Sequence, residues 1–472
     1  MTIEAWVPGL LGYLIPLGLF LLAWGGMEPA RARRSTTAGG VALALGVLGY
    51  FTVGFAFHLG GAGLLSDQPG LTSLTRLFAG EGGSEWGLVG LAGFFLAGDD
   101  VTPEIQSLFL IYAPLVISTV LMTVLSLSGR ARGWQMVAGG LLVAGGLFPI
   151  AACWVWGGGW LANLGSTLRR GHGFVDYGGS AVVYLLSGFT ALGSLMGLGG
   201  RWRHNPPEAS RTESAVAMPP SHFPLLANLG ALLFGLGWLG WSLSTPFHVI
   251  GAELNVPRIA VNGLLAGAGA VITAQAYCWF TTGRADALMS ARGAAAGFIA
   301  ISASAPFVPH WAALVIGAVA GLLLPLGVFL VDQILRLPDA TATIGLGITA
   351  GAWGALAVAL FADGRSGQGW NGVGLTEYHT VLGQGVTGFL PADGFIADGR
   401  GQMIAQLAGL GAIGISAWLV SWLTFFVLSL PDGHVAGSSR TRDAQQLASG
   451  WIRPWRKKAT SQQDTEKEAD RS

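Results

Sequence analysis

Charged residues are scarce in this chain. Lys, Arg, Asp and Glu make up 11% of its 472 residues, whereas about 25% is usual for a soluble domain. Basic and acidic residues balance at 25 each, so the chain as a whole has no field that would attract nucleic acid. The two cysteines, Cys153 and Cys278, lie within apolar runs, and we expect buried small side chains rather than a disulfide or a metal site. This composition argues against a nucleic-acid partner and favours a protein embedded in membrane lipid.

Sequence patterns of enzymatic chemistry are also missing. The chain has no phosphate-binding loop and no HExxH, GxSxG or CxxC pattern. None of its eight histidines is predicted at the middle of an apolar run, where a proton relay or metal site would be expected. Five are predicted at the outer side and three at the cytoplasmic side: His58, His172, His248, His310 and His379, then His204, His222 and His434. We therefore expect no catalytic residue, no bound metal and no cofactor.

Long apolar runs and glycine are abundant instead. Hydrophobic residues make up 52% of the chain, and 75 residues are glycine. Glycine lets helix backbones approach closely in lipid, where no hydrophobic effect drives helices together. Eleven runs are long enough to cross about 30 Å of hydrocarbon: 7–27, 38–58, 106–127, 135–156, 177–199, 223–245, 257–280, 288–305, 310–334, 343–361 and 403–430. The sequence predicts an all-α polytopic membrane protein, and such a bundle favours a channel or transporter over a structural subunit.

The arginines of the short connections predict the orientation. EPARARR, GRARG, GGRWRH, TTGRADALMSARG and QILRLP all fall on odd-numbered connections, and basic loops stay in the cytoplasm. The N-terminus is then outside the cell membrane and the C-terminus is cytoplasmic. The start of the chain lacks a basic signal region, so we expect its apolar run to be retained as the first span. We expect residues 1–430 to form the membrane domain and 431–472 to be a partly disordered tail that contacts anionic lipid.

A few polar and aromatic residues within or beside the spans need a reason. Asp176 opens the fifth span in DYGGSAVVYLLSG, where a carboxylate caps a helix, attracts a cation, or does both. Trp156 and Trp241 lie towards outer span ends. They are either interfacial belt residues or, if turned inward near Asp176, a surface for a cation.

The stretch DYGGSAVVYLLSG, together with FPIAACWVWGGGWLANLG before it, resembles the ammonium transporter family (Amt/Mep/Rh). Seven further pieces match in order between residues 8 and 430: AWGGMEPAR, GWLGWSLST, RIAVNGLLAG, GAAAGFIAISA, HWAALVIGAVAGL, IGLGITAGAWGAL and GQMIAQLAGLGAIGISAW. The resemblance implies a homotrimer. It also implies that each subunit holds its own pore between two inverted five-helix repeats, with an eleventh helix alongside.

The resemblance also implies a substrate vestibule above the pore. Trp156 matches the family's vestibule tryptophan and Asp176 its fifth-span acid. Trp241 stands where the family has phenylalanine, and Thr245 where it has serine. The resemblance therefore implies that the vestibule still recognises a cation, with residues of the same chemical types.

The departures from the family lie deeper in the pore. Leu115, or Ile111 one turn away, replaces the gate phenylalanine. Tyr184 stands at the first pore histidine and Gly347 at the second, so the twin histidines are absent by this match. Gly347 is expected to leave an imidazole-sized space. Unless a neighbour such as Thr349 fills it, the pore is expected to be either wider and wetter or collapsed. Tyr184 is either part of the path or a core tyrosine bonded to a helix carbonyl.

Three functional hypotheses follow. The first is a divergent channel for a small neutral or weakly basic solute such as ammonia, methylamine or CO2. The second is a non-conducting ammonium-sensing or accessory membrane subunit. The third is a transporter for a larger substrate that uses the room expected at Gly347. Loss of the histidine pair argues against ordinary electrogenic ammonium uptake, because imidazoles in a dry pore supply hydrogen-bond sites and a proton route.

Overall fold

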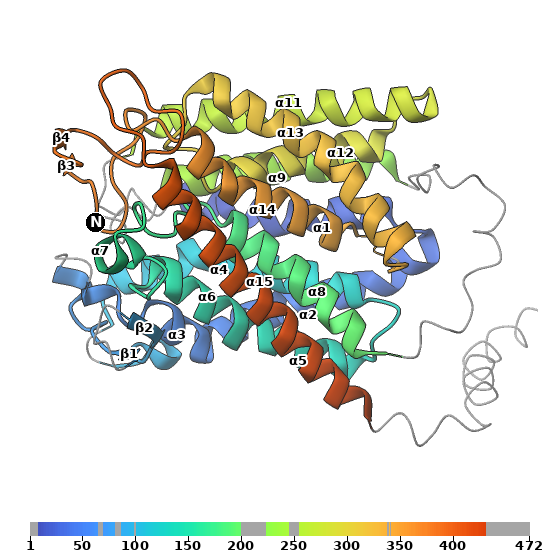
Figure 1. Cartoon of the computed structure of the whole chain (residues 1–472). Helices are drawn as coiled ribbons and strands as arrows, with labels where there is room; N and C mark the ends of the chain where they lie inside the picture. Colours follow the sequence, from blue (N-terminus) through green and yellow to red (C-terminus); the bar gives the residue numbers. More distant parts are fainter. Residues whose placement is uncertain are drawn as a thin grey trace, which may run out of the picture. The chain divides into compact units, whose positions relative to one another are not determined.

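The structure is a computed structural model, and it shows an all-α bundle of the kind the apolar runs predict (Figure 1). Ten helices are long and apolar enough to cross a membrane, and the shorter apolar helix Ala287–Ile301 lies among them. The predicted fold class is confirmed. The structure describes residues 8–64, 69–80, 86–98, 101–199, 223–244, 254–337, 339 and 341–430.

Helices carry almost all of the regular structure. The first half contains α1 (Leu14–Gly26), α2 (Pro29–Gly49), α3 (Phe55–Leu59), α4 (Pro103–Leu127), α5 (Gly133–Leu142), α6 (Phe148–Trp156), α7 (Leu164–Leu168) and α8 (Leu186–Gly197). The second half contains α9 (Pro224–Ser244), α11 (Val256–Thr282), α12 (Ala287–Ile301), α13 (His310–Phe329) and α14 (Thr343–Phe361), followed by α15 (Gly399–Ser429). The predicted tail falls outside the described residues.

Most predicted spans agree with these helices within a few residues, and the tenth, 343–361, coincides with α14. The second differs, because α2 already begins at Pro29 and includes the arginines that were predicted as a loop. Pro29 occupies the first turn, where its missing N–H is not needed and its fixed φ suits a helix. Alanine and arginine then continue the helix well.

Four segments have π-helical geometry and continue a neighbouring α-helix: Tyr50–Gly54, Val143–Leu147, Ser180–Leu185 and Leu330–Ile334. Such wide turns are rare and often accompany functional sites. Two of them bear on the site below, because Tyr50–Gly54 runs into α3 and Ser180–Leu185 runs into α8.

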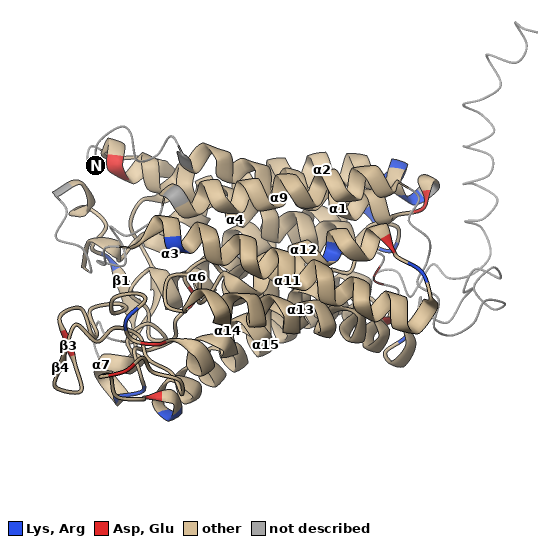
Figure 2. Cartoon of the chain, turned by 90° about the horizontal axis from the view of Figure 1, so that it is seen from above, with Lys and Arg blue, Asp and Glu red and all other residues tan. Residues whose placement is uncertain are grey.

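The two ends of the bundle differ. Short strands lie at one end as two antiparallel pairs, β1 (Leu77–Ala79) with β2 (Gly87–Gly90) and β3 (Glu377–Tyr378) with β4 (Val381–Leu382). We call this end, which also carries α7, the loop-rich end (Figure 1). Charged residues gather at the two ends and leave the middle of the helices apolar (Figure 2). This distribution is typical of a multi-pass membrane protein.

Glycine brings several helix backbones into direct contact, as its abundance predicts. A Cβ atom added at Gly18 of α1 would lie 2.6 Å from the carbonyl oxygen of Gly230 in α9. A Cβ added at Gly317 of α13 would lie 2.0 Å from the carbonyl oxygen of Ala266 in α11. No side chain fits at either crossing, so small residues set these interhelical distances.

Candidate functional site

Asp176 caps the π-helical segment that leads into α8. Its side chain is fully buried, and Oδ2 accepts the backbone N–H groups of Ala181 and Val182, both at 2.9 Å. Gly179 makes the turn with φ +83°, a left-handed conformation that favours glycine. Burial raises the pKa of Asp176 to about 6, against the lowering effect of these N–H groups. The second oxygen, Oδ1, is buried and has no hydrogen-bond partner among the described residues.

Asp339 makes the same cap at the start of α14. Its Oδ2 accepts the N–H groups of Ile344 at 2.6 Å and Gly345 at 3.3 Å. The bonded residues again lie five and six positions after the aspartate. Helices α8 and α14 are antiparallel neighbours, because Gly347 lies against Tyr184 whereas Gly354 lies against Ser180. The two caps are therefore at opposite ends of one helix pair, as two inverted repeats require.

Tyr184 and Gly347 occupy equivalent places in this pair, each the eighth residue after its capping aspartate. Tyr184 is fully buried, and its ring packs edge to face on Phe234 with 6.0 Å between centroids. Its hydroxyl has no hydrogen-bond partner among the described residues. The alternative of a core tyrosine bonded to a helix carbonyl is therefore not what the described structure shows.

The space expected at Gly347 is absent. A Cβ atom added there would lie 2.4 Å from the carbonyl oxygen of Tyr184 and 3.2 Å from the backbone nitrogen of Gly188. The backbone of α14 at Gly347 is in direct contact with the backbone at Tyr184 and Gly188. Thr349 does not fill the position either, since its hydroxyl donates to the carbonyl of Gly345 at 2.6 Å and its methyl group faces Gly327 of α13. The hypothesis of a larger substrate loses its structural basis.

Trp156 and Trp241 both point into the protein rather than to the surface. Each is 1% exposed. The Trp156 indole donates to the carbonyl of Asp176 at 2.7 Å, and the Trp241 indole donates to the carbonyl of Ile111 at 3.0 Å. Because their N–H groups are used in this way, both tryptophans offer only ring faces to a ligand. Neither is an interfacial belt residue, and the inward orientation is the one that a cation surface requires.

Each tryptophan packs against a tyrosine. Tyr112 of α4 packs against Trp156 with 5.5 Å between ring centroids, and Tyr177 packs against Trp241 at 5.8 Å. We call these two pairs, Trp156 with Tyr112 and Trp241 with Tyr177, the aromatic cluster. Neither tyrosine was among the predicted site residues.

The remaining predicted residues have simpler positions. Ile111 and Leu115 are both buried, one turn apart on the same face of α4. The indole of Trp241 donates to the carbonyl of Ile111. Thr245 lies outside the described residues. Leu115 is 1% exposed and Tyr184 is fully buried, so solvent does not reach either side chain.

Two glutamines of α15 hold the segment that delivers Asp176. Gln406 accepts the N–H of Val175 and donates to the carbonyls of Val175 and Ala355, all at 2.8–2.9 Å. Gln402 accepts the N–H of His172 and donates to the carbonyl of Gly173, both at 2.9 Å. The sequence motif GQMIAQLAG contained both glutamines, and their spacing of four residues on one helix face was the signal that could have indicated this role.

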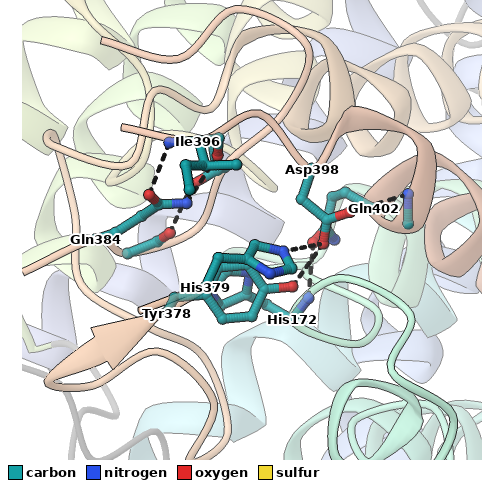
Figure 3. A network of polar contacts seen from close by, with 10 residues as sticks. His172, Tyr378, His379, Gln384, Ile396, Asp398 and Gln402 are labelled. Carbon is teal, nitrogen blue, oxygen red and sulfur yellow. Dashed lines mark hydrogen bonds and ion pairs between the residues drawn. The ribbon is translucent and has the colours of Figure 1, made fainter. Parts of the chain in front are cut away.

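An aromatic and acidic network covers the same segment (Figure 3). The ring of Tyr378 lies 4.1 Å from that of His172, and its hydroxyl donates to Asp398 at 2.5 Å. His379 lies 3.7 Å from the same carboxylate. Burial, followed by the nearby His379, lowers the pKa of His172 to about 3. His172 is therefore neutral at physiological pH, and neither of its ring nitrogens has a partner among the described residues.

A small pocket lies at the opposite end of the bundle, near the start of α14. Its cavity volume is about 20 Å³, room for about one water molecule. Its lining comes from α1, α4 and the Asp339 turn: Leu19, Leu22, Ala23, Leu121, Met122, Leu125, Thr341, Thr343 and Leu346. The walls are apolar apart from two threonines. No group of three or more metal-ligating side chains occurs in the described parts of the chain.

Comparison with known proteins places these features in one family. The model of the Ammonium Transporter Family matches residues 9–435. The "Ammonium transporter Amt2" of Archaeoglobus fulgidus is 30% identical over 329 residues, which are 69% of this chain and 63% of that protein. The "Ammonium transporter" of Bacillus subtilis is 29% identical over 290 residues, 60% of this chain and 64% of that protein. The chain thus matches less than two thirds of the length of these curated relatives.

Solved structures agree on the fold. A structure described as "Sensor Amt Protein" superposes with a TM-score of 0.68 at 21% sequence identity and covers 90% of this chain and 91% of that chain. Mep2 of Candida albicans superposes with a TM-score of 0.66 at 20% identity and covers 89% of this chain and 82% of that chain.

Proposed function

The chain belongs to the ammonium transporter family, and from that premise we propose that it is a membrane channel for a small neutral or weakly basic solute. Ammonia with ammonium, methylamine and CO2 are the solutes of this class. We propose that it works without a pair of pore histidines. The observation that carries the proposal is the equivalence of Tyr184 and Gly347 in the two inverted halves, which leaves one phenol and no imidazole at the pair of positions that face each other.

Recognition takes place in the aromatic cluster. The ring faces of Trp156 and Trp241 attract a small cation, and the unpaired Oδ1 of Asp176 supplies a negative charge close to Tyr184. The hydroxyl of Tyr184 then offers one donor and one acceptor to a solute that passes. A phenol exchanges protons poorly at neutral pH because its reference pKa is about 10. Solute therefore crosses this level in its neutral form, without a proton relay through the chain.

The passage below Tyr184 is apolar with single hydroxyls. Thr190 and Ser194 on α8 are buried, and their hydroxyls have no partner among the described residues. The pocket near Thr341 and Thr343 lies towards the opposite end. Isolated hydroxyls in an apolar wall suit a molecule that makes one or two hydrogen bonds at a time.

The close backbone contact at Tyr184 favours a second function, ammonium sensing without transport. Gly347 is buried against the backbone of Tyr184, and the side chain of Tyr184 is fully buried. A solute that binds in the aromatic cluster but goes no further would make the chain an ammonium-sensing or accessory subunit. The solved structure described as "Sensor Amt Protein" shares the fold, which is compatible with this second function and does not select it.

We also propose the assembly and orientation that the family resemblance implies. The loop-rich end faces outward, the C-terminal residues are cytoplasmic, and three copies form a homotrimer in membrane lipid. The described surface offers many exposed apolar side chains to neighbouring copies or lipid, such as Leu264, Ile272 and Phe280 on α11. Native mass spectrometry from nanodiscs distinguishes a trimer from a monomer.

The test of the proposed function is a flux assay in proteoliposomes. Gradients of ammonium, methylammonium and CO2 are imposed while membrane current and internal pH are recorded together. We expect a pH change from ammonia entry with little current, because no imidazole pair carries the proton. A large ammonium current would contradict the mechanism. Binding of ammonium without flux of any of the three solutes would replace the channel by the sensing function.

A further inference from the structure

A buried imidazole lies in the wall of the aromatic cluster. His58 of α3 is fully buried, and its ring is nearly perpendicular to that of Tyr112, with 4.7 Å between centroids. Trp156 lies 5.8 Å away, Phe148 6.0 Å and Tyr50 6.1 Å, all between ring centroids. The imidazole is thus surrounded by aromatic rings from α4, α6 and the π-helical segment before α3.

The two ring nitrogens of His58 have different surroundings. Nδ1 lies 3.0 Å from the hydroxyl of Tyr50, which forms a hydrogen bond in either tautomer. Nε2 has no hydrogen-bond partner among the described residues, and neither has the hydroxyl of Tyr112. Two unpaired polar atoms therefore belong to two rings in direct contact, and both side chains are fully buried.

Such an arrangement is costly unless something fills it. A buried polar atom without a partner costs about 1–3 kcal/mol, and native proteins pair almost all such atoms with protein, water or a ligand. Leucine and phenylalanine at positions 58 and 112 would avoid the cost. The arrangement therefore indicates a small guest that makes hydrogen bonds.

The chemistry of the walls selects the guest. Trp156 gives its N–H to the carbonyl of Asp176, so it presents a ring face, and ring faces attract cations. With its proton on Nδ1, His58 accepts a hydrogen bond at Nε2, and the Tyr112 oxygen can accept one as well. A small cation with several N–H donors satisfies all of these groups at once, whereas an anion meets acceptors and negative ring faces.

We propose that His58 Nε2 and the Tyr112 hydroxyl form a binding site for a small protonated amine, ammonium or methylammonium, beside Trp156. The inference rests on the proposed function, because it gives the same solute a second set of contacts. The hydroxyl of Tyr50 accepts the hydrogen on Nδ1 and so leaves Nε2 as the acceptor. The Tyr112 oxygen accepts a second N–H of the cation, and the ring of Trp156 faces its charge.

The site is tested by ammonium binding to the full-length chain in lipid nanodiscs. Tryptophan fluorescence is titrated with ammonium chloride, with sodium chloride at equal ionic strength as the salt control. Loss of one hydrogen bond to a cation weakens binding about tenfold or more. We expect that effect in His58→Leu and in Tyr112→Phe. Tyr277→Phe on α11, which removes a tyrosine hydroxyl outside the aromatic cluster, is the matched control and is expected to bind like the parent chain.

The outcomes separate this site from the proposed function. Equal ammonium affinity in the parent chain and Tyr112→Phe would overturn the site while leaving channel activity intact. Binding that depends on His58 and Tyr112, in a chain that passes no solute, would keep the site and remove the channel. If His58→Leu does not fold, Tyr112→Phe decides, because that change removes only the unpaired oxygen.

Nitrogen NMR of labelled histidine gives an independent check. We expect the His58 proton on Nδ1 and a shift of the Nε2 signal on addition of ammonium but not of sodium. A proton on Nε2, or an Nε2 signal that ammonium does not move because only water occupies the site, would overturn the proposal.

Discussion

The Cα atom of Gly347 faces the backbone carbonyl of Tyr184 so closely that an added Cβ would lie 2.4 Å from the oxygen. The contact joins the second turn of α14 to the π-helical segment before α8, in the antiparallel pair that Asp339 and Asp176 cap. A side chain added at position 347 would therefore meet backbone.

Gly347→Ala is expected to destabilise the protein. The new methyl group meets backbone, which cannot rotate away, so the helix pair must separate at a cost of about 1–3 kcal/mol. Thermal unfolding in detergent, followed by fluorescence, measures the change. Gly411→Ala on α15 is the matched control, since an added Cβ there has nothing within 4 Å and alanine favours a helix over glycine. An unchanged unfolding temperature for Gly347→Ala would show that α8 and α14 are further apart.

Tyr184→Phe is expected to leave stability unchanged or slightly higher, because the removed hydroxyl has no partner among the described residues and its burial is unfavourable. In the proposed channel, passage of ammonia is expected to fall several-fold, since an unpaired hydroxyl that could bond to the solute is lost. The proteoliposome assay measures passage, and Tyr277→Phe on the outer helix α11 serves as the control. Lower stability with normal flux would assign Tyr184 to the core.

Local patterns in the sequence predicted the helices and the residues of the main motifs. Apolar runs located α14 to the residue, and the acid before the fifth span does cap it. The sequence could not predict distances between helices. The space expected at Gly347 is missing because α14 moves in to the backbone of Tyr184, and this depends on the packing of the whole bundle.

Long-range and irregular features were missed for related reasons. Gln406 pairs with Val175 across 231 positions of the chain, and no local pattern contains that pairing. His58 lies at a span end as expected, in the last turn of α3, but its burial among aromatic rings was not foreseen. The π-helical segment Tyr50–Gly54 precedes α3, and the shift of helical phase that such a segment makes cannot be read from a regular period of 3.6 residues.

Gln406→Leu is expected to destabilise the segment before Asp176. The N–H and carbonyl of Val175 and the carbonyl of Ala355 lose their partner inside the protein, at a cost of about 1–3 kcal/mol. Ammonium affinity should fall as well, because Asp176 is the next residue. Gln333→Leu makes the same substitution at an exposed position and is the matched control. Normal binding and stability in Gln406→Leu would mean that other contacts place the segment.

His172 is expected to make the loop-rich end sensitive to acid. Its pKa is lowered to about 3 in the fold from an ordinary value of 6.5. A histidine of this kind contributes stability above about pH 6.5, and the contribution is lost as the pH falls towards 3, because the unfolded chain binds the proton first. His172→Leu should flatten this slope while losing some contact with Tyr378. Because burial lowers the pKa of His172 more than the nearby His379 does, His379→Leu should retain most of the pH dependence of stability. Unfolding temperatures between pH 7.5 and 4 measure both.

Asp176 is expected to act in the opposite direction over part of the same range. Burial raises its pKa to about 6 from 3.8, so the folded chain takes up the proton before the unfolded chain does. The contribution to stability is fully present below about pH 3.8 and is lost as the pH rises through about 6, on the order of 3 kcal/mol over the interval. Asp176→Asn keeps an oxygen that accepts the N–H groups of Ala181 and Val182 and removes the charge.

The two effects are separated by making Asp176→Asn in the His172→Leu background, where the opposing histidine slope is gone. The single variant His172→Leu should then become less stable from pH 4 to pH 6.5, and the double variant should not. The same pair tests the role of the carboxylate in recognition, because Asp176→Asn removes the negative charge beside Tyr184 while the rings of the aromatic cluster stay in place. Ammonium affinity at pH 7.5 should therefore fall, whereas at pH 5, where Asp176 is largely protonated in the parent chain, the two proteins should bind alike. Equal affinities at pH 7.5 would leave Asp176 as a helix cap alone.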